Sequence, residues 1–165
     1  MKKRMRSVSD FFTTEPPQMP TYGTGMAVEI LDVPIWRLQR FIDSRQYNIS
    51  PSGQLGEGRG SRRVFTREDL HRISLANWLL TDGFATQFVG SVVRQIEDSD
   101  LDVYIGHEGE ETPLNLVFQR GKDGPIVRIY SAKRAATIND AYYRLDLDKV
   151  FAGVDARIAK LQQSQ

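Results

Sequence analysis

The sequence contains no cysteine among its 165 residues. This absence excludes disulfide bonds, thiolate metal sites and cysteine nucleophiles, and it fits a protein of the reducing cytoplasm. Histidine is scarce as well, because only His71 and His107 are present and no carboxylates stand around them at metal-ligand spacing. We therefore expect no metal site and no cofactor.

Long apolar runs and catalytic motifs are also missing. No hydrophobic stretch approaches the ~20 residues of a membrane span, and the basic N-terminus lacks the apolar segment of a secretion signal. Prolines at 16, 17 and 20 lead us to expect a disordered arm over residues 1–20. The chain has no Gly-x-Ser-x-Gly, no phosphate-binding glycine loop ending in Lys-Ser/Thr and no His-Glu-x-x-His. We expect no enzymatic activity.

The net charge of +1 hides an uneven distribution. Residues 1–72 hold 12 Lys and Arg against 8 Asp and Glu, a net +4, whereas residues 73–165 hold 10 against 13, a net −3. This imbalance favours a polyanionic partner for the first half. Charged residues that only solvate the surface would give the same imbalance, so the charge distribution alone does not show that the partner is a polyanion. The acids Glu108, Glu110 and Glu111 are expected to lie in a solvated turn.

The stretch 56–70, which reads GEGRGSRRVFTREDL, combines three local signals. Its alternating glycines predict a flexible loop, and arginines at 59, 62 and 63 make this loop basic. A β-type Arg-Val-Phe step follows, and then Thr66 with Asp69 three residues later forms a capping box that starts a helix. Such a loop, anchored at its base, is how a wing carries cations to a polyanion. Bracing the wing against the following helix is an alternative role for Arg63.

Two short helices are predicted before this stretch. Residues 25–31 have a helical composition, and Pro34 suits the first turn of a second helix that ends at about Arg45. In the second helix the inward positions are Ile35, Leu38, Phe41 and Ile42, and the outward ones are Trp36, Arg37 and Arg40. Two helices joined by a tight turn, the second basic on its outer face, are the organisation of a helix-turn-helix. Two helices that serve only as a packing unit would give the same pattern, so the helices alone do not indicate DNA binding.

The segment after the wing is predicted to be helical as well. We expect a helix over 67–81 that ends at a glycine C-cap, Gly83, and another over 84–97. His71 is expected to be a partly exposed structural residue, because no second histidine lies near it. Aromatic residues at inward spacing are expected in the core rather than in a ligand cage: Phe41, Phe65, Trp78, Phe84 and Phe88.

From residue 22 to about 96 the sequence resembles the MerR-type winged helix-turn-helix DNA-binding domain. The family's Val-x-x-x-x-Leu-Arg-x-Tyr pattern is matched by residues 33–41, with Gln39 in the place of the arginine and Phe41 in that of the tyrosine. Its wing, Arg-x-Tyr followed by a capping stretch and Asp-Leu, is matched by residues 63–70, and its Gly-Phe by residues 83–84. The resemblance covers a little under half of the chain.

The chain departs from this family in two places. The turn after the first wing strand is longer and richer in glycine than is usual. The long dimerising coiled coil that should follow the fourth helix is missing, because the acidic residues 97–100 break the helical pattern. Another part of the chain must then make any dimer contact.

The resemblance implies a sequence-specific transcriptional regulator, a homodimer on a two-fold site in double-stranded DNA. The second helix would enter the major groove and the wing would lie on the flanking backbone. The candidate DNA contacts are Pro34, Trp36, Arg37, Gln39, Arg40, Arg45, Arg59, Arg62 and Arg63. The alternative is an interaction, assembly or architectural protein of phage or mobile-element type that uses the same winged module. A small-molecule effector stays an open question.

Beyond residue 100 the sequence pattern changes to strands. Runs over 103–105, 114–118 and 126–130 are β-rich, and residues 121–124, Gly-Lys-Asp-Gly, predict a hairpin between the last two. Residues 141–144 fit a strand or a helix. The second module is therefore expected to be a small antiparallel sheet.

The chain is expected to end in an amphipathic helix over 147–161, and the predicted fold class is α+β. The expected division is a disordered arm (1–20), a MerR-like domain (21–98) and a small α+β domain (99–165) for dimerisation or effector binding. The terminal helix has an apolar face made by Leu147, Val150, Phe151, Val154, Ile158 and Leu161. We expect this face, together with the sheet, to form the dimer contact; covering the sheet within one chain is the alternative.

Overall fold

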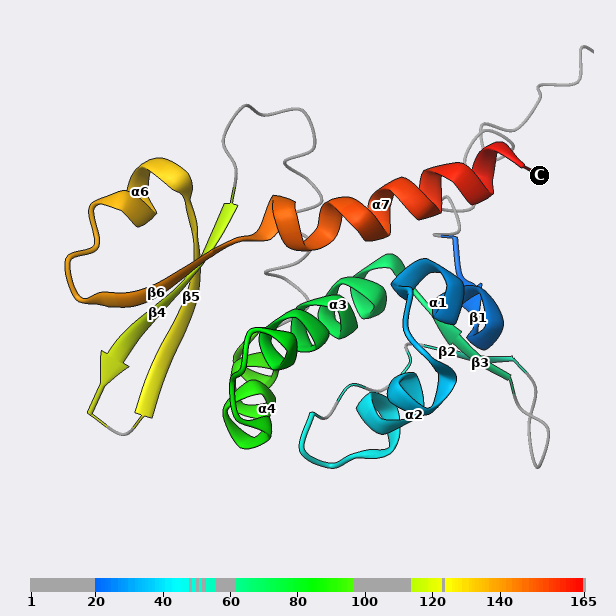
Figure 1. Cartoon of the computed structure of the whole chain (residues 1–165), viewed down its shortest axis with the longest axis horizontal. Coiled ribbons are helices and arrows are strands. Elements are labelled where there is room, and N and C mark those ends of the chain that lie inside the picture. Colours follow the sequence, from blue (N-terminus) through cyan, green and yellow to red (C-terminus); the bar gives the residue numbers. More distant parts are fainter. Residues whose placement is uncertain are drawn as a thin grey trace, which may run out of the picture.

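The computed structural model describes residues 20–47, 49, 51, 53–55, 62–96, 114–122 and 124–164. Within these residues the fold is α+β, with six helices and two three-stranded antiparallel sheets (Figure 1). None of the described helices is both long and apolar enough to cross a membrane. One hydrophobic core runs from Tyr22 near the start to Ile158 in the last helix, so both halves of the chain share it.

The N-terminal sheet consists of three short strands. It contains β1 (Tyr22–Gly23), β2 (Gly53–Leu55) and β3 (Arg62–Phe65), with β3 in the middle. Strands β2 and β3 pair antiparallel, and the glycine-rich loop connects them in the sequence. The loop itself, 56–61, lies outside the described residues, and so does Arg59.

Helices α1 (Thr24–Leu31) and α2 (Ile35–Asp43) follow β1 and are joined by a tight turn. Asp32 makes the turn with a left-handed φ of 54°, a conformation that aspartate tolerates better than most residues. Pro34 is the N-cap of α2. Leu38 and Phe41 are buried as predicted, but Ile35 is 52% exposed, so its predicted inward placement is wrong. Burial of α2 begins one turn into the helix, and its first turn stands in solvent.

Helix α3 (Arg67–Thr81) has the predicted bounds because its ends are set by local chemistry. The Thr66 hydroxyl accepts a hydrogen bond from the Asp69 amide at 3.3 Å, and the Asp69 carboxylate accepts one from the Thr66 amide at 2.9 Å. Together they satisfy amides that the first turn would otherwise leave unpaired. Gly83 follows the helix with a φ of 93°, where a side chain would be strained.

Helix α4 (Thr86–Gln95) fixes the loop that follows α2. A Cβ added at Gly90 would collide with the carbonyl oxygen of Gln46, so the two backbones approach each other closely. The Arg94 guanidinium also donates a hydrogen bond to that oxygen at 2.7 Å. The end of α2 is therefore held in place by α4.

The C-terminal sheet consists of β4 (Leu114–Gly121), β5 (Gly124–Ser131) and β6 (Ala141–Asp146), with β4 in the middle. The predicted hairpin is confirmed, since Gly121 pairs with Gly124, and residues 141–144 are a strand rather than a helix. A short helix that the sequence did not predict, α6 (Ala132–Ala136), connects β5 to β6. The predicted strand 103–105 and the acids at 108, 110 and 111 lie outside the described residues.

Hydrogen bonds from two side chains help to fasten this sheet to the helices. The side-chain amide of Gln95, in α4, makes two hydrogen bonds to the backbone of β5. Its oxygen accepts from the Val127 backbone N–H and its nitrogen donates to the Pro125 carbonyl, both at 3.2 Å, so Gln95 occupies the outer edge of β5. The Tyr143 hydroxyl donates to the Asp82 carboxylate at 2.6 Å. Burial and this charged acceptor raise the pKa of Tyr143 to about 12.

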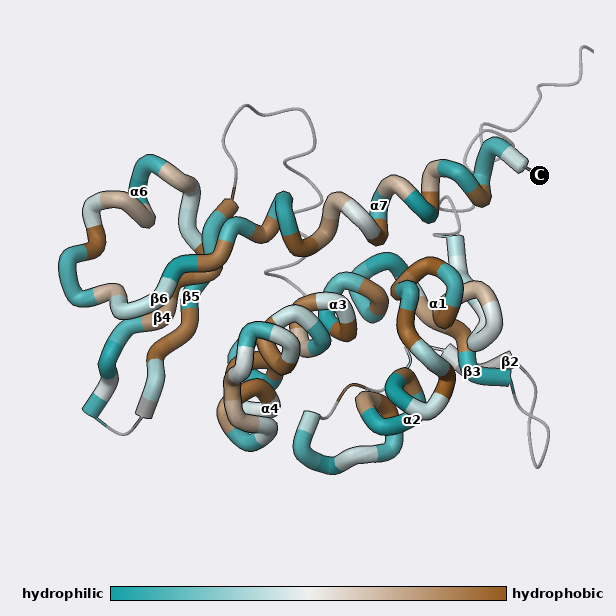
Figure 2. Tube along the Cα trace, in the orientation of Figure 1, coloured by the Kyte–Doolittle hydropathy of each residue, from teal (hydrophilic) through white to brown (hydrophobic). Residues whose placement is uncertain are grey.

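Helix α7 (Leu147–Gln163) runs from the C-terminal sheet back along α3 and α1 (Figure 1). Its hydrophobic positions lie mainly on the side turned to these two helices (Figure 2). Leu147, Val150, Phe151, Val154 and Ile158 are buried there within a single chain, and Leu161 is half-buried against the same core. The prediction that this face makes a dimer contact is therefore corrected: the face covers α3 and α1 of its own chain.

A polar cluster sits inside the contact between α3 and α7. The Asp155 carboxylate accepts hydrogen bonds from Arg67 Nε at 2.9 Å and from His71 Nε2 at 2.8 Å. The His71 ring is fully buried and stacks on Phe151 with its centroid 4.2 Å away, so the prediction of a partly exposed histidine is wrong. Burial by itself raises the pKa of Asp155, but the hydrogen bonds from His71 and Arg67 outweigh it and lower this pKa.

We predict that Asp155→Asn lowers the free energy of unfolding by about 2 kcal/mol, because charge-assisted hydrogen bonds to two α3 side chains are weakened. A carboxylate with a lowered folded pKa stabilises the fold above its unfolded pKa, and this contribution is lost as pH falls through the folded value. Denaturant melts of the wild type should therefore lose stability in mildly to strongly acidic solution more steeply than those of the variant.

The matched control is Glu29→Gln, which neutralises an exposed acid of α1 and should leave the unfolding curve almost unchanged. Equal stabilities of Asp155→Asn and wild type at neutral pH would show that the cluster does not hold α7 to α3.

Candidate nucleic-acid interface

The outer side of α2 faces solvent and carries several of the predicted contact residues. We define the α2 outer face as Ile35, Trp36, Gln39 and Arg40, all of which are exposed. Ile35 and Gln39 lie one turn apart, as do Trp36 and Arg40, so the four form two adjacent rows along the helix. The opposite side of α2 is anchored in the core by Leu38 and Phe41, which fixes the direction in which these rows point.

An ion pair connects α2 to the strand β3. Arg63 Nη2 lies 2.8 Å from Asp43 Oδ1, and both side chains are partly exposed. Arg63 therefore braces β3 against α2. The alternative role suggested by the sequence was a contact between Arg63 and the helix that follows the wing, α3. Asp43 had no role in the sequence prediction, because residues 20 positions apart give no local signal of their pairing.

The structure brings several of the predicted contacts onto these two elements. Pro34 is exposed at the start of α2, Arg37 is half-buried, and Arg45 is exposed just after the helix. Arg62 is exposed at the start of β3, next to the Arg63–Asp43 pair. Together the segments 34–47 and 62–65 carry five arginines and a single acid, Asp43. This excess of positive charge attracts a polyanion.

Two large apolar side chains stand within this basic surface. Ile35 is 52% exposed and Trp36 is 59% exposed, the highest values among the large hydrophobic residues of the described chain. Both belong to the first turn of α2, and Pro34 beside them is exposed as well. The surface therefore offers apolar contact together with positive charge.

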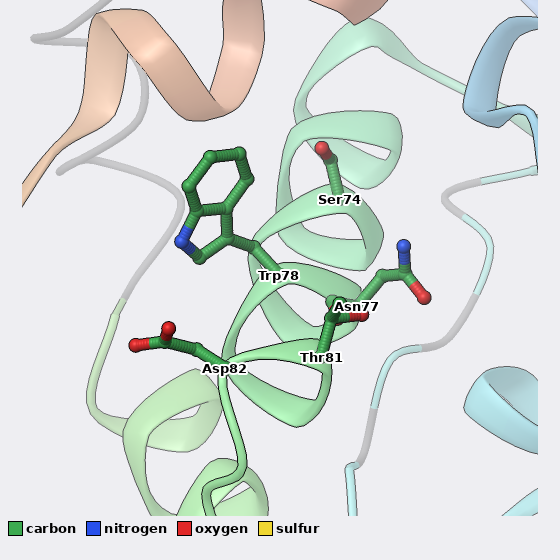
Figure 3. A pocket seen from close by; sticks show the side chains of 5 residues that line it. All are labelled: Ser74, Asn77, Trp78, Thr81 and Asp82. Atoms are coloured by element: carbon green, nitrogen blue, oxygen red, sulfur yellow. The ribbon is translucent and has the colours of Figure 1, made fainter.

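A shallow pocket of about 270 Å³ lies on α3 but has a different character (Figure 3). Its lining includes Trp78, which is 41% exposed, so the prediction of a core position for this residue is wrong. Asn77 points away from Trp78 and Asp82 in Figure 3, so the polar groups do not converge on one point. Two of the lining residues already make hydrogen bonds within the fold: the Ser74 hydroxyl donates to the Val150 carbonyl, and the Asp82 carboxylate accepts from the Tyr143 hydroxyl.

The remaining aromatic residues follow the prediction of a core role. Phe41 and Phe65 are buried, and Phe84 and Phe88 stack with each other against Phe118 of β4. In the part of the chain that the structure describes, no three His, Asp or Glu side chains gather to hold a metal ion. Neither the protein-family models nor the curated proteins compared with the chain give a match.

We predict that the α2 outer face contributes almost nothing to stability. Trp36→Ala should change the free energy of unfolding by no more than about 0.5 kcal/mol, because the side chain is mostly in water. Phe41→Ala, five residues along the same helix, should cost about 3–5 kcal/mol, because it leaves a cavity beside the Tyr47 ring.

Thermal and denaturant melts of both variants measure this difference directly. A loss of stability in Trp36→Ala similar to that in Phe41→Ala would mean that Trp36 is part of the core and not a free surface group.

Proposed function

We propose that this protein is a sequence-specific DNA-binding transcriptional regulator without enzymatic activity, acting in the cytoplasm. The α2 outer face reads base edges in the major groove, while Arg62, Arg45 and the basic loop leading into β3 contact the flanking backbone. The observation that carries the proposal is the concentration of five arginines against one acid in the segments 34–47 and 62–65, which hold α2 and β3 and are joined by the Arg63–Asp43 pair.

The geometry of duplex DNA gives each group a distinct role. The major groove is wide enough for one α-helix, and phosphate contacts position a protein without specifying sequence. Arg40 on the outer face suits a bidentate contact with guanine, and Gln39 suits one with adenine. Arg62 lies on a strand at the side of α2 and suits a phosphate contact.

The order of the elements supports the resemblance to the MerR-type winged helix-turn-helix. Two helices separated by a tight turn are followed by an antiparallel pair of strands, and a capped helix comes directly after them. We propose that α1 and α2 form the helix-turn-helix and that β2 and β3 form the wing. The homodimer that the resemblance implies needs a contact other than the apolar face of α7, since this face is buried within the chain.

One observation favours a second candidate function. The exposed pair Ile35 and Trp36 is also the kind of surface that binds a protein, and aromatic side chains are common at the centres of such interfaces. The chain would then be an assembly or architectural protein that uses the winged module to bind another protein. DNA binding by the purified chain separates the two functions.

The first test is a titration of the full chain onto random duplex DNA at low and high salt. We predict binding at low salt that weakens as salt rises, because neutralised phosphates release their counterions. Arg62→Ala should weaken binding to all sequences and reduce the log–log salt slope by roughly 0.9, the value for one lost phosphate contact. Arg40→Ala should also change which sequences are preferred.

The control is Lys160→Ala, which removes one positive charge from the exposed side of α7 and should leave affinity and preference unchanged. No binding at low salt would end the DNA hypothesis and favour the protein-binding alternative. Identical effects of Arg40→Ala and Arg62→Ala on sequence preference would contradict the separate roles of α2 and β3.

A further inference from the structure

The first turn of α2 carries an apolar pair on an otherwise basic surface. The described chain exposes few large hydrophobic residues, and only Ile35 and Trp36 are neighbours in the sequence. Each has a polar residue one turn further along α2: Gln39 follows Ile35, and Arg40 follows Trp36. A ligand that lies along α2 therefore meets apolar groups first and hydrogen-bonding groups one turn later.

Burial within the chain does not account for this pair. The side of α2 that meets the core is made by Leu38 and Phe41, whereas Ile35 and Trp36 are more than half exposed. An apolar patch rimmed by polar and charged residues marks an interaction surface more often than a stretch of ordinary surface. The positive charge on the segments around the pair selects an anionic occupant over a neutral one.

We propose that Ile35 and Trp36 contact the C5-methyl groups of thymine in the major groove and so make the protein select A·T pairs at those positions. This inference rests on the proposed DNA-binding function and adds a chemical basis for its specificity. The thymine methyl is the apolar group that bases present in the major groove. The N-terminal residues of a recognition helix are those that contact base edges.

The neighbouring polar residues fit the same kind of site. Glutamine reads adenine through its N6 and N7 atoms, and thymine is the partner of adenine. Gln39 lies one turn after Ile35, so this row of α2 offers one group for adenine and one for a thymine methyl on the same or an adjacent pair. In the other row Arg40 offers a guanine contact one turn after Trp36.

Insertion of the pair between bases from the minor groove fits the geometry less well. Such wedges are apolar side chains that enter the minor groove, which is only about 6 Å wide and does not admit a helix. Ile35 and Trp36 lie in the first turn of α2, and Gln39 and Arg40 follow them one turn later on the same face. The major groove accommodates the whole helix and both rows.

The experiment compares thymine with uracil, which keeps every hydrogen-bonding group and lacks only the methyl. Duplexes are selected from a random pool with the full-length chain and are then synthesised with deoxyuridine in place of thymidine. We predict that the wild type binds the uracil duplexes about four-fold more weakly for each contacted methyl, since one buried methyl group is worth about that much. Replacing one thymine at a time then locates the contacted positions.

The variant Ile35→Ala/Trp36→Ala should bind thymine and uracil duplexes equally. Its fold is checked by its melting curve, which should match that of the wild type because both side chains are mostly in water. Arg40→Ala is the matched comparison on the same face: it should weaken binding to both duplexes and keep the ratio between them.

Three other results would overturn the inference in distinguishable ways. Equal binding of thymine and uracil duplexes by the wild type would reject methyl contacts and leave the proposed DNA-binding function standing. A thymine preference that survives in Ile35→Ala/Trp36→Ala would show that other residues contact the methyl groups. Failure of the wild type to bind any duplex at low salt would reject the proposed function together with this inference, and would point to a protein partner for the pair.

Discussion

The Asp155 carboxylate, in the middle of α7, accepts hydrogen bonds from Arg67 and His71 of α3, and the placement of the last helix depends on it. Residues more than 80 positions apart meet at this point, in the midst of a buried apolar contact. The Asp155 side chain is only 26% exposed, and a carboxylate that is largely removed from water is costly unless its hydrogen bonds are satisfied, so this contact favours one alignment of the two helices. With α7 aligned, its apolar side chains complete the core shared by both halves of the chain.

This alignment determines which surfaces remain free. α7 covers α3 and α1, and the C-terminal sheet is fastened to α4 by Gln95 and to the end of α3 by Tyr143. In the view of Figure 1, α2 lies on the side of α3 opposite α7. The outer face of α2 and the adjoining strand β3 therefore stay open, and they carry the arginine excess and the exposed apolar pair. The contact between α7 and α3 lies on one side of the molecule, and the proposed DNA contact is assigned to the other.

Sequence patterns were most successful where nearby residues set the structure, although the short helix α6 was missed. Thr66, Asp69 and Gly83 fix the ends of α3, which had the predicted bounds, and two glycines fix the turn between β4 and β5 at the predicted place, although both strands are longer than predicted. Features set by distant residues were missed. His71 is buried because α7 covers it, and Trp78 and Ile35 are exposed although their spacing looks inward, because helical periodicity does not tell where a neighbouring element ends. The Arg63–Asp43 pair and the burial of the α7 face needed the tertiary structure for the same reason.

The most direct test of the proposed DNA-binding surface is the change in backbone amide NMR signals when duplex DNA is added to the full chain. Binding through α2 and β3 predicts that the signals of residues 34–45 and 62–65 shift first and furthest, while those on the outer side of α7 and in the C-terminal sheet change little. Shifts concentrated in the sheet or on α7, with α2 unaffected at saturating DNA, would contradict the proposal.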